Sequence, residues 1–187
     1  MIRLYKGILD FVLVFLFLFI FSLFIFILII FLSFNSNGPI FFIQKRVGKD
    51  GKEFNLIKFR TMKLNTLNKG THLLKGDEIT THGKWMRSFK LDELPQIINV
   101  IQGHMSFVGP RPCLPNQYSV IDERTKRNVL TIKPGITGLS QIKRVDMSNP
   151  KLLAKIDQMY MEKMNIFFDL KLLFLTAFGK GIGDTIK

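Results

Sequence analysis

The sequence predicts an α-rich α+β fold: one cytoplasmic globular domain with a small β-hairpin, anchored by an N-terminal membrane helix and by interfacial amphipathic helices. Three observations lead to this prediction. Residues 11–34 form a long apolar run, two short β-rich segments follow it, and the remainder shows mainly helical spacing of apolar residues. A chain of 187 residues has room for one core after the run. We therefore predict a membrane helix at residues 1–34 and a single domain at residues 35–187.

The apolar run is long enough to cross a bilayer. No charged residue lies between Asp10 and Lys45, and the run is apolar apart from Ser22 and Ser33. As a helix it would be about 36 Å long, against a hydrocarbon core of about 30 Å. A secretory signal peptide has an apolar region of about 7–15 residues and an A-x-A-like cleavage site, which does not follow this run. The run is therefore predicted to remain in the membrane.

Composition leaves two geometries open for this helix. Cations flank both ends of the run, with more of them on the C-terminal side: Arg3 and Lys6 before it, and Lys45, Arg46, Lys49 and Lys52 after it. The positive-inside rule then places the domain in the cytoplasm. The helix either spans the bilayer or bends near Ser22 and returns to the same face, each arm reaching about 18 Å. Composition alone favours the spanning helix.

The charge balance predicts anionic partners. Lys and Arg number 27 against 14 Asp and Glu, a formal net charge of +13. Anionic lipid head groups and nucleotides both fit such a charge, and the membrane segment makes lipid the simplest explanation for much of it. We do not expect nucleic acid as a partner. The single cysteine, Cys113, cannot form an internal disulfide, which is typical of a reduced, cytosol-facing protein.

After the run, the spacing of residues predicts a hairpin and several helices. Residues 40–47 and 54–62 are predicted strands joined by the turn at residues 49–52. Lys58 and Arg60 would point to one face of the second strand, displaying two cations together. A polar loop is expected at residues 63–81. Short helices are predicted at 84–89 and 91–103, and longer ones at 152–164 and 166–178; glycine- and proline-bearing turns are predicted at 109–112 and 133–138.

The adjacent acids Asp92 and Glu93 are the leading candidates for chemistry. Pro95 suits a first helical turn, so both acids are expected at a helix N-terminus, where a carboxylate is favoured in its charged form. Capping of the helix is the simpler explanation for acids there. The cations in nearby segments suit phosphate binding instead: Lys58, Arg60, Arg87 and Arg111. An ionised carboxylate can attack phosphorus, and Mg²⁺ is the natural ion to neutralise the developing charge.

Other catalytic patterns do not occur in the sequence. His72, His82 and His104 have no metal-ligand spacing, and no Walker-type phosphate loop or G-x-G-x-x-G fingerprint is found. The three histidines are therefore interpreted as ordinary residues, and the missing motifs argue against an NTPase and a Rossmann dehydrogenase.

Five ordered motifs together resemble one protein family, the bacterial phosphoglycosyl transferases of the monotopic type. The motifs lie at residues 44–48 (QKRVG), 58–62 (KFRTM), 91–96 (LDELPQ), 105–112 (MSFVGPRP) and 133–139 (KPGITGL). The resemblance covers nearly the whole chain in order, which makes it far more specific than any single motif.

The resemblance implies a reaction and roles for the candidate residues. Asp92 would attack the β-phosphorus of a UDP-sugar, release UMP and carry a phosphosugar that polyprenol (undecaprenyl) phosphate then accepts. Glu93 would assist it, with Mg²⁺ held at Asp92, and Arg111 would grip a phosphate or the nucleotide. The resemblance gives less definite phosphate-binding or structural roles to the remaining cations, Lys58, Arg60, Arg87 and Lys133.

The resemblance also implies a location and a substrate class. The family's membrane element resembles a re-entrant helix broken at a Ser-Pro pair, so we expect both ends of residues 1–34 on the cytoplasmic face of the bacterial plasma membrane. Here Leu23 follows Ser22, His104 replaces the usual aspartate, and residues 141–146 depart from the commoner ending. The tail at residues 179–184 looks like members that handle N-acetylated amino sugars. The alternatives are a hexose-1-phosphate transferase and a non-enzymatic, membrane-bound basic adaptor.

Overall fold

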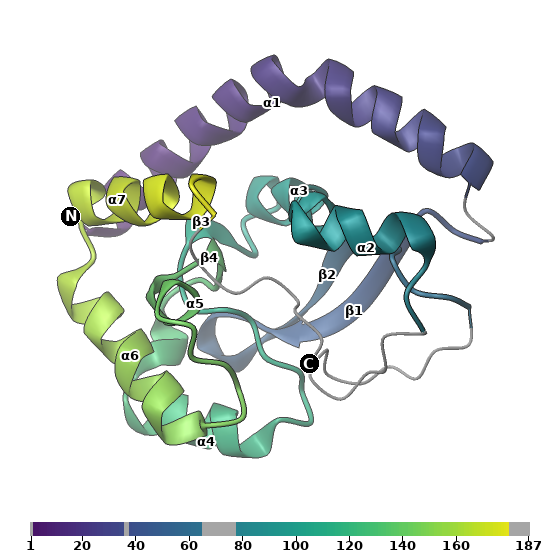
Figure 1. Ribbon diagram of the computed structural model, residues 1–187. Helices are drawn as coiled ribbons and strands as arrows, with labels where there is room; N and C mark the ends of the chain where they lie inside the picture. Colours follow the sequence, from purple (N-terminus) through teal and green to yellow (C-terminus); the bar gives the residue numbers. More distant parts are fainter. Residues whose placement is uncertain (1, 36–37, 65–77, 180–187) are drawn as a thin grey trace.

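The computed structural model describes residues 2–35, 38–64 and 78–179, with side chains from Tyr5 onward. One long helix, α1 (Ile2–Asn35), arches over a body made of short helices and two small sheets, and its two ends approach the body more closely than its middle (Figure 1). The structure thus confirms a helix-rich fold with small sheets and a long apolar N-terminal helix.

The predicted hairpin is present. Strands β1 (Phe41–Val47) and β2 (Glu53–Phe59) pair antiparallel, joined by the 3-10 turn η1 (Lys49–Gly51). Asp50 and Gly51 adopt φ of 56° and 73°, a left-handed backbone suited to these residue types. Strand β2 ends at Phe59, although Arg60 N still donates to Ile40 O at 2.7 Å, and Lys58 is buried. The prediction that both cations are displayed on the strand is therefore wrong for Lys58.

A second sheet was not predicted. Strands β3 (Ser106–Val108) and β4 (Gly135–Thr137) pair in parallel, so the predicted turn at residues 133–138 contains a strand. Glycine is required where these segments meet. A Cβ at Gly135 would lie 2.0 Å from the backbone nitrogen of Gly109, and one at Gly138 would lie 2.1 Å from the Gly109 carbonyl oxygen. The two motif segments are thus pressed together backbone to backbone.

The helix predicted at residues 91–103 is divided by Pro95. Helix α2 (Thr81–Ser88) is followed by the 3-10 turn η4 (Leu91–Glu93) and then by α3 (Gln96–Ile101), while Gly103 at φ 77° ends the unit. Of the loop predicted at residues 63–81, residues 65–77 lie outside the described part; Met62 and Ile79 form an antiparallel bridge between its ends.

The remaining helices complete the body. They are α4 (Tyr118–Lys126), the 3-10 turn η5 (Val129–Thr131), α5 (Leu139–Ile142), α6 (Pro150–Lys163) and α7 (Ile166–Ala177). The last two confirm the helices predicted at 152–164 and 166–178. Asn149 and Asn165 cap them by accepting hydrogen bonds from Leu152 N and Phe168 N.

The C-terminal half of α1 packs on the body through apolar side chains. Leu28 and Leu32 are buried with Phe59 of β2 and Met86 of α2. The aromatic rings of Phe31 and Trp85 lie 6.3 Å apart at the same contact. Helix α1 is therefore held to α2 and the hairpin near its C-terminal end.

The N-terminal end of α1 is held by polar groups instead. Lys6 Nζ donates to Asp169 Oδ2 at 2.8 Å, to Tyr160 Oη at 2.9 Å and to the Val108 carbonyl at 2.9 Å. Tyr160 also donates to Asp169 Oδ1 at 2.7 Å. One turn further, Asp10 Oδ1 accepts from Ser106 Oγ at 2.9 Å and from Phe107 N at 3.0 Å. This polar anchor joins α1 to β3, α6 and α7.

Between its two attachments, α1 presents large apolar side chains to the exterior. Residues 5–35 are long and apolar enough to cross a membrane, by length and composition. Most of the large side chains of the helix are exposed, among them Phe11, Phe15, Phe19, Leu23 and Phe26. Ser33 Oγ donates a hydrogen bond to the carbonyl four residues earlier, Ile29 O, at 2.8 Å. Ser22, where a bend was predicted, shows no such bond within the described residues.

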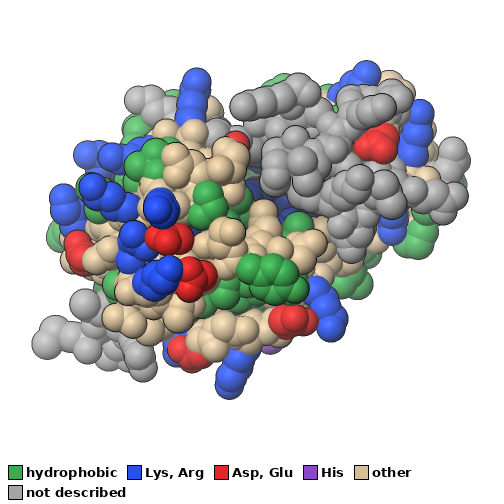
Figure 2. Space-filling model, turned by 90° about the horizontal axis from the view of Figure 1, so that it is seen from below, with side chains coloured by type: hydrophobic (Ala, Val, Ile, Leu, Met, Phe, Trp, Pro, Cys, Tyr) green, Lys and Arg blue, Asp and Glu red, His purple; other side chains and the backbone are tan. Residues whose placement is uncertain are grey.

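Helix α7 continues this apolar surface. Asp169 and Leu172 face the body, while Phe167, Leu170, Phe174 and Phe178 are exposed. In Figure 1, α7, α2 and α3 lie along the side of the body that faces α1. The opposite face, shown in Figure 2, carries many charged side chains of both signs. The molecule therefore has one apolar side and one charged side.

Candidate active site

The two candidate acids lie in the tight turn η4 between α2 and α3. Asp92 and Glu93 are 3% and 6% exposed, so their carboxylates belong to the interior of the domain. The turn closes through hydrogen bonds from Glu93 N to Lys90 O and from Leu94 N to Leu91 O, each at 3.2 Å. Because α3 has only six residues and starts after Pro95, a helix dipole is a minor source of stabilisation for these acids.

Glu93 is held by two cations from distant parts of the chain. Its Oε1 accepts from Lys58 Nζ at 3.2 Å and from Arg111 Nη2 at 3.0 Å. Lys58 comes from β2 and Arg111 from the segment after β3. Removing one partner of a buried ion pair strongly destabilises a protein, because the other charge then remains unpaired in a poorly solvated place. The structure thus brings together three of the residues predicted from the sequence, beside Asp92.

The segment that carries Arg111 is fixed by its backbone carbonyls. Arg124 Nη1 donates to Arg111 O at 2.8 Å, and Arg46 Nη1 donates to Pro112 O at 3.1 Å. Gly135 N donates to Pro110 O at 2.9 Å. Arg124 is in turn fixed by Asp157 through bonds of 2.7 and 3.0 Å. Arg111 is therefore preorganised by supports that extend to α6.

The other predicted cations have different neighbours. Arg87 Nε donates to Thr61 Oγ1 at 2.9 Å, and its buried Nη1 has no hydrogen-bond partner within the described residues. Arg60 donates to the carbonyls of Pro39 at 2.8 Å and Phe41 at 3.4 Å. Lys133 Nζ lies 3.7 Å from the position of a Cβ at Gly103. These contacts of Arg60 and Lys133 do not involve Glu93, and the phosphate-binding roles of both residues stay predictions.

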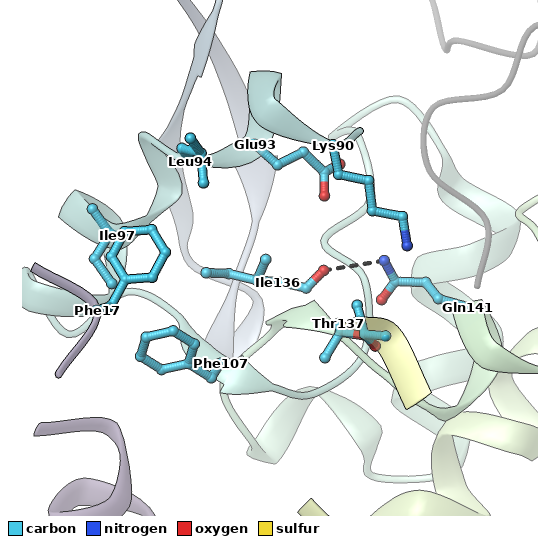
Figure 3. A pocket seen from close by; sticks show the side chains of 10 residues that line it. Phe17, Lys90, Glu93, Leu94, Ile97, Phe107, Ile136, Thr137 and Gln141 are labelled. Carbon is cyan, nitrogen blue, oxygen red and sulfur yellow. Dashed lines mark hydrogen bonds between the residues drawn. The ribbon is translucent and has the colours of Figure 1, made fainter. Parts of the chain in front are cut away.

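A cavity of about 200 Å³ opens beside Glu93, between the body and α1. Figure 3 shows apolar side chains at one end of it and the Lys90 and Gln141 side chains at the other. The cavity is lined by Phe17, Lys90, Glu93, Leu94, Ile97, Phe107, Ile136, Thr137, Gln141 and Thr176. Sequence reasoning missed Lys90 and Gln141. The cation directly before the acid pair was available as a clue to Lys90, whereas only the fold brings Gln141 to the site.

Burial lowers the pKa of Lys90 from its ordinary value of 10.5, because a charged ammonium is poorly solvated at this position. Glu93 opposes the shift by favouring the charged form, and the charge of Arg111 adds to it. Lys90 is thus part of the electrostatic environment of the acid pair.

The carboxylates fit a metal ion shared with a substrate better than a metal caged by the protein. No group of three or more His, Cys, Asp or Glu residues that could hold a metal is found within the described residues. Mg²⁺ is commonly bound by one or two carboxylates together with substrate phosphates and water. Lys58 and Arg111 pair with Glu93, and the binding of Mg²⁺ at Asp92 stays a prediction.

Three known proteins that this chain resembles are named as transferases of sugars or sugar phosphates. The uncharacterized sugar transferase EpsL of Bacillus subtilis is 40% identical over 139 residues, which are 74% of this chain and 68% of that protein. The UDP-glucose:undecaprenyl-phosphate glucose-1-phosphate transferase of Escherichia coli is 37% identical over 158 residues, 77% of this chain and 33% of that protein. An Aeromonas hydrophila protein is 32% identical over 166 residues, 79% of this chain and 38% of that protein. Its name is UDP-N-acetylgalactosamine-undecaprenyl-phosphate N-acetylgalactosaminephosphotransferase.

The chain thus spans about two thirds of the length of the Bacillus relative and about a third of the other two. The family described as bacterial sugar transferase matches residues 1–180, nearly the whole chain. With that match, and with the acid pair and its cations in one buried cluster, the chain belongs to the bacterial sugar transferase family.

Proposed function

We propose that this protein transfers a sugar-1-phosphate from a UDP-sugar to polyprenol (undecaprenyl) phosphate at the membrane surface. The observation that carries the proposal is the buried cluster in which Lys58 and Arg111 hold Glu93 beside Asp92. A carboxylate nucleophile needs cations close by when it attacks an already anionic phosphate. The names of the Escherichia and Aeromonas relatives support the same substrates.

The reaction proceeds in two displacements at one phosphorus atom. A carboxylate oxygen of Asp92 attacks the β-phosphorus of the UDP-sugar, and the bond from that phosphorus to the bridging oxygen breaks, so that UMP leaves with the electron pair. An oxygen of the acceptor phosphate then attacks the same phosphorus. The bond to Asp92 breaks, the carboxylate is restored, and the sugar is joined to the lipid through a diphosphate.

The neighbouring residues keep the charges in balance. Lys58 and Arg111 orient Glu93 and place positive charge where negative charge develops; Arg87, with an unsatisfied Nη1, is available to a phosphate oxygen. Asp92 would hold a magnesium ion, which would supply positive charge to offset the charge of the substrate phosphates.

Intact-protein mass spectrometry tests the covalent step. Purified protein in nanodiscs, incubated with Mg²⁺ and a UDP-sugar but without lipid acceptor, should gain the mass of one phosphosugar. Asp92→Asn should gain none, whereas Asp122→Asn, at an exposed ion pair with Lys126 on α4, should behave as the wild type. Phosphosugar labelling of Asp92→Asn would overturn the assignment of the nucleophile.

The proposal has two versions, in which the transferred sugar is either an N-acetylated amino sugar or a hexose. The family resemblance of the tail favours an N-acetylated amino sugar, and residues 180–187 of that tail lie outside the described residues. The relatives named for UDP-glucose, at 37% and 39% identity, favour a hexose. The mass added in the same experiment separates them, because it is measured across a panel of UDP-sugars. The adaptor alternative expects no added mass with any of them, and binding to anionic vesicles that weakens steeply with salt.

We also propose that α1 is re-entrant, with both ends on the cytoplasmic side. The support is that Lys6 and Asp10 contact the same body as Leu28 and Leu32, while the side chains between them are exposed and apolar. A straight spanning helix would separate these two ends by the bilayer thickness. An N-terminal tag should therefore react with an impermeant reagent only from the cytoplasmic side; reaction from the periplasm would contradict this geometry.

A further inference from the structure

The cavity beside Glu93 has two chemically different ends. Phe17 of α1, Ile97 of α3 and Phe107 of β3 form the apolar end, which connects the cavity to the membrane helix. Lys90 and Gln141 form the polar end, on the other side of Ile136 (Figure 3). A site with such polarity suits a ligand that has an anionic head and an apolar chain.

The polar end is not satisfied by the protein itself. Gln141 is 7% exposed, and its Nε2 donates to Ile136 O at 3.1 Å, but its Oε1 has no hydrogen-bond partner within the described residues. A buried, unpaired amide oxygen is destabilising. In the described part of the chain Lys90 forms no salt bridge, although its ammonium is partly buried near Glu93. The Gln141 oxygen and the Lys90 ammonium thus lack partners among the protein groups that the structure describes, and a ligand or ordered water would complete their hydrogen bonds.

The backbone at Lys90 supports the same reading. Lys90 adopts φ 58°, directly after the C-cap residue of α2, where glycine is the usual residue. A lysine there retains a conformational penalty that glycine would not have. The consequence of this conformation is an ammonium placed at the polar end of the cavity.

Size narrows the choice of occupant. The cavity holds about 200 Å³, below the roughly 300–1,000 Å³ of pockets that enclose a whole drug-sized ligand. A nucleotide sugar is larger and polar throughout, so it does not match this space. The head and first carbons of a long isoprenoid chain do match it, with the rest of the chain continuing along α1 into the membrane.

We infer that this cavity binds the phosphate-proximal end of the isoprenoid acceptor, with the phosphate accepting from the Lys90 ammonium and from the second N–H of Gln141 Nε2, and with the first isoprene carbons against Phe17, Ile97 and Phe107. The inference rests on the proposed function, because it assigns the acceptor subsite of that reaction. Glu93 lines the cavity and Asp92 precedes it in the same turn, so the acceptor phosphate lies next to the carboxylate that carries the phosphosugar. The attacking oxygen then displaces Asp92 as described above.

The two half-reactions provide the test. In nanodiscs containing undecaprenyl phosphate, Lys90→Met should raise the KM for the acceptor about tenfold or more, the loss of one charge-assisted hydrogen bond. In the first half-reaction, a single turnover of UMP release without acceptor, the KM for the UDP-sugar should stay within about threefold of the wild type, because the nucleotide does not occupy this cavity.

Two further variants separate binding from folding. Lys90→Gly removes the ammonium and also relieves the left-handed backbone, so it should keep or raise the thermal midpoint while raising the acceptor KM. Asn128→Gly, at an exposed residue with φ 57° far along the chain, relieves the same kind of backbone and should leave both half-reactions unchanged. A purely structural role for Lys90 expects a lower midpoint in Lys90→Gly.

Competition by acceptor analogues gives an independent readout. Geranyl phosphate should compete with the acceptor better than geraniol or inorganic phosphate, and Lys90→Met should remove most of the advantage of geranyl phosphate over geraniol. Lys90→Arg keeps the charge and should retain that advantage.

The outcomes are distinguishable. If the wild type releases no UMP from any UDP-sugar, the proposed function fails. If it does so, and Lys90→Met leaves the acceptor KM unchanged or raises the KM for UDP-sugar instead, the acceptor subsite is wrong while the proposed function stands.

Discussion

Two buried carboxylates organise this molecule, and they do so in different ways. Glu93 gathers Lys58 and Arg111 from within the domain, beside a second acid and a third cation, Lys90. Asp169 gathers Lys6 from α1 and Tyr160 from α6, and its two oxygens have one partner each at 2.8 and 2.7 Å from these groups. The first cluster holds a surplus of cations near a cavity, whereas the second is balanced. The comparison teaches that two similarly buried carboxylates differ in the charge around them, and that the acids proposed to react lie in the cluster with more cations.

The largest effect should come from breaking the Glu93 cluster. Glu93→Gln keeps the shape but leaves Lys58 and Arg111 facing a neutral amide, a change of about 3–5 kcal/mol in a buried ion pair. UMP release should fall by about a hundredfold or more, since each 1.4 kcal/mol lost from transition-state stabilisation is a factor of ten. The measurement is single-turnover UMP release with Asp122→Asn as control; near-normal turnover in Glu93→Gln would mean that the cluster is structural.

Breaking the Asp169 cluster should give the opposite pattern. Asp169→Asn should reduce the free energy of unfolding by about 3 kcal/mol, because Lys6 and Tyr160 lose a buried anionic partner, while UMP release by the folded fraction changes only a fewfold. The single tryptophan, Trp85, is close to Phe31 of α1, so its fluorescence reports unfolding at the helix contact. A loss of chemistry equal to that of Glu93→Gln would erase the distinction between the two clusters.

The lowered pKa of Lys90 should make the stability of the protein depend on pH. Between the folded pKa and about 10.5, the unfolded chain binds more protons than the folded protein. The free energy of unfolding therefore falls as the pH is lowered from about 10.5 to the folded pKa of Lys90. Lys90→Met should therefore be more stable than the wild type at neutral pH, and the difference should shrink as pH rises toward that of the unfolded lysine. Thermal midpoints in detergent between pH 7 and 10.5 provide the measurement, and a difference that grows with pH would contradict the prediction.

The smallest effect is expected at Arg60. Its contacts are the carbonyls of Pro39 and Phe41 and the ring of Phe42, 5.6 Å from the guanidinium. Arg60→Ala should lower UMP release by no more than about threefold, a change of less than 1 kcal/mol. Arg111→Ala is the matched comparison and should lower it far more; equal losses would place Arg60 in the active site after all.

The sequence predicted the elements whose signals are local. The hairpin followed from two segments rich in β-forming residues around a four-residue turn, and the last two helices followed from helical spacing and from an apolar stretch. The β3–β4 pair was missed because strands of three residues have no period, and because their pairing joins segments 29 residues apart, Ser106 to Gly135. Pro95 was expected in the first turn of a helix at residues 91–103; in the structure it is the N-cap residue of α3, and the two acids lie in a separate 3-10 turn before it.

The sequence predicted which residue types form the candidate site, but not which of them contact one another. The surplus of cations near Asp92 and Glu93 indicated phosphate chemistry, and Lys58 and Arg111 indeed meet Glu93. Arg60 was predicted to share a strand face with Lys58, because the second strand was expected to continue to residue 62, whereas β2 ends at Phe59. Gln141 has no local pattern, because only the packing of α5 against β4 brings it to the cavity. Tertiary contacts decide which of several similar cations belongs to a site.

The polar anchor of α1 has a consequence for the order of events during synthesis. Lys6 is separated from Asp169 by 163 residues, so at about 5–20 residues per second roughly 8–30 s pass before its partner is made. During that interval α1 is already available to the membrane while its anchor does not exist. In the proposed re-entrant geometry, Lys6 and Asp10 then stay hydrated at the surface where they started. Closure of α7 onto Lys6 is accordingly a late step, in which the finished domain locks a helix that the lipid has already accepted.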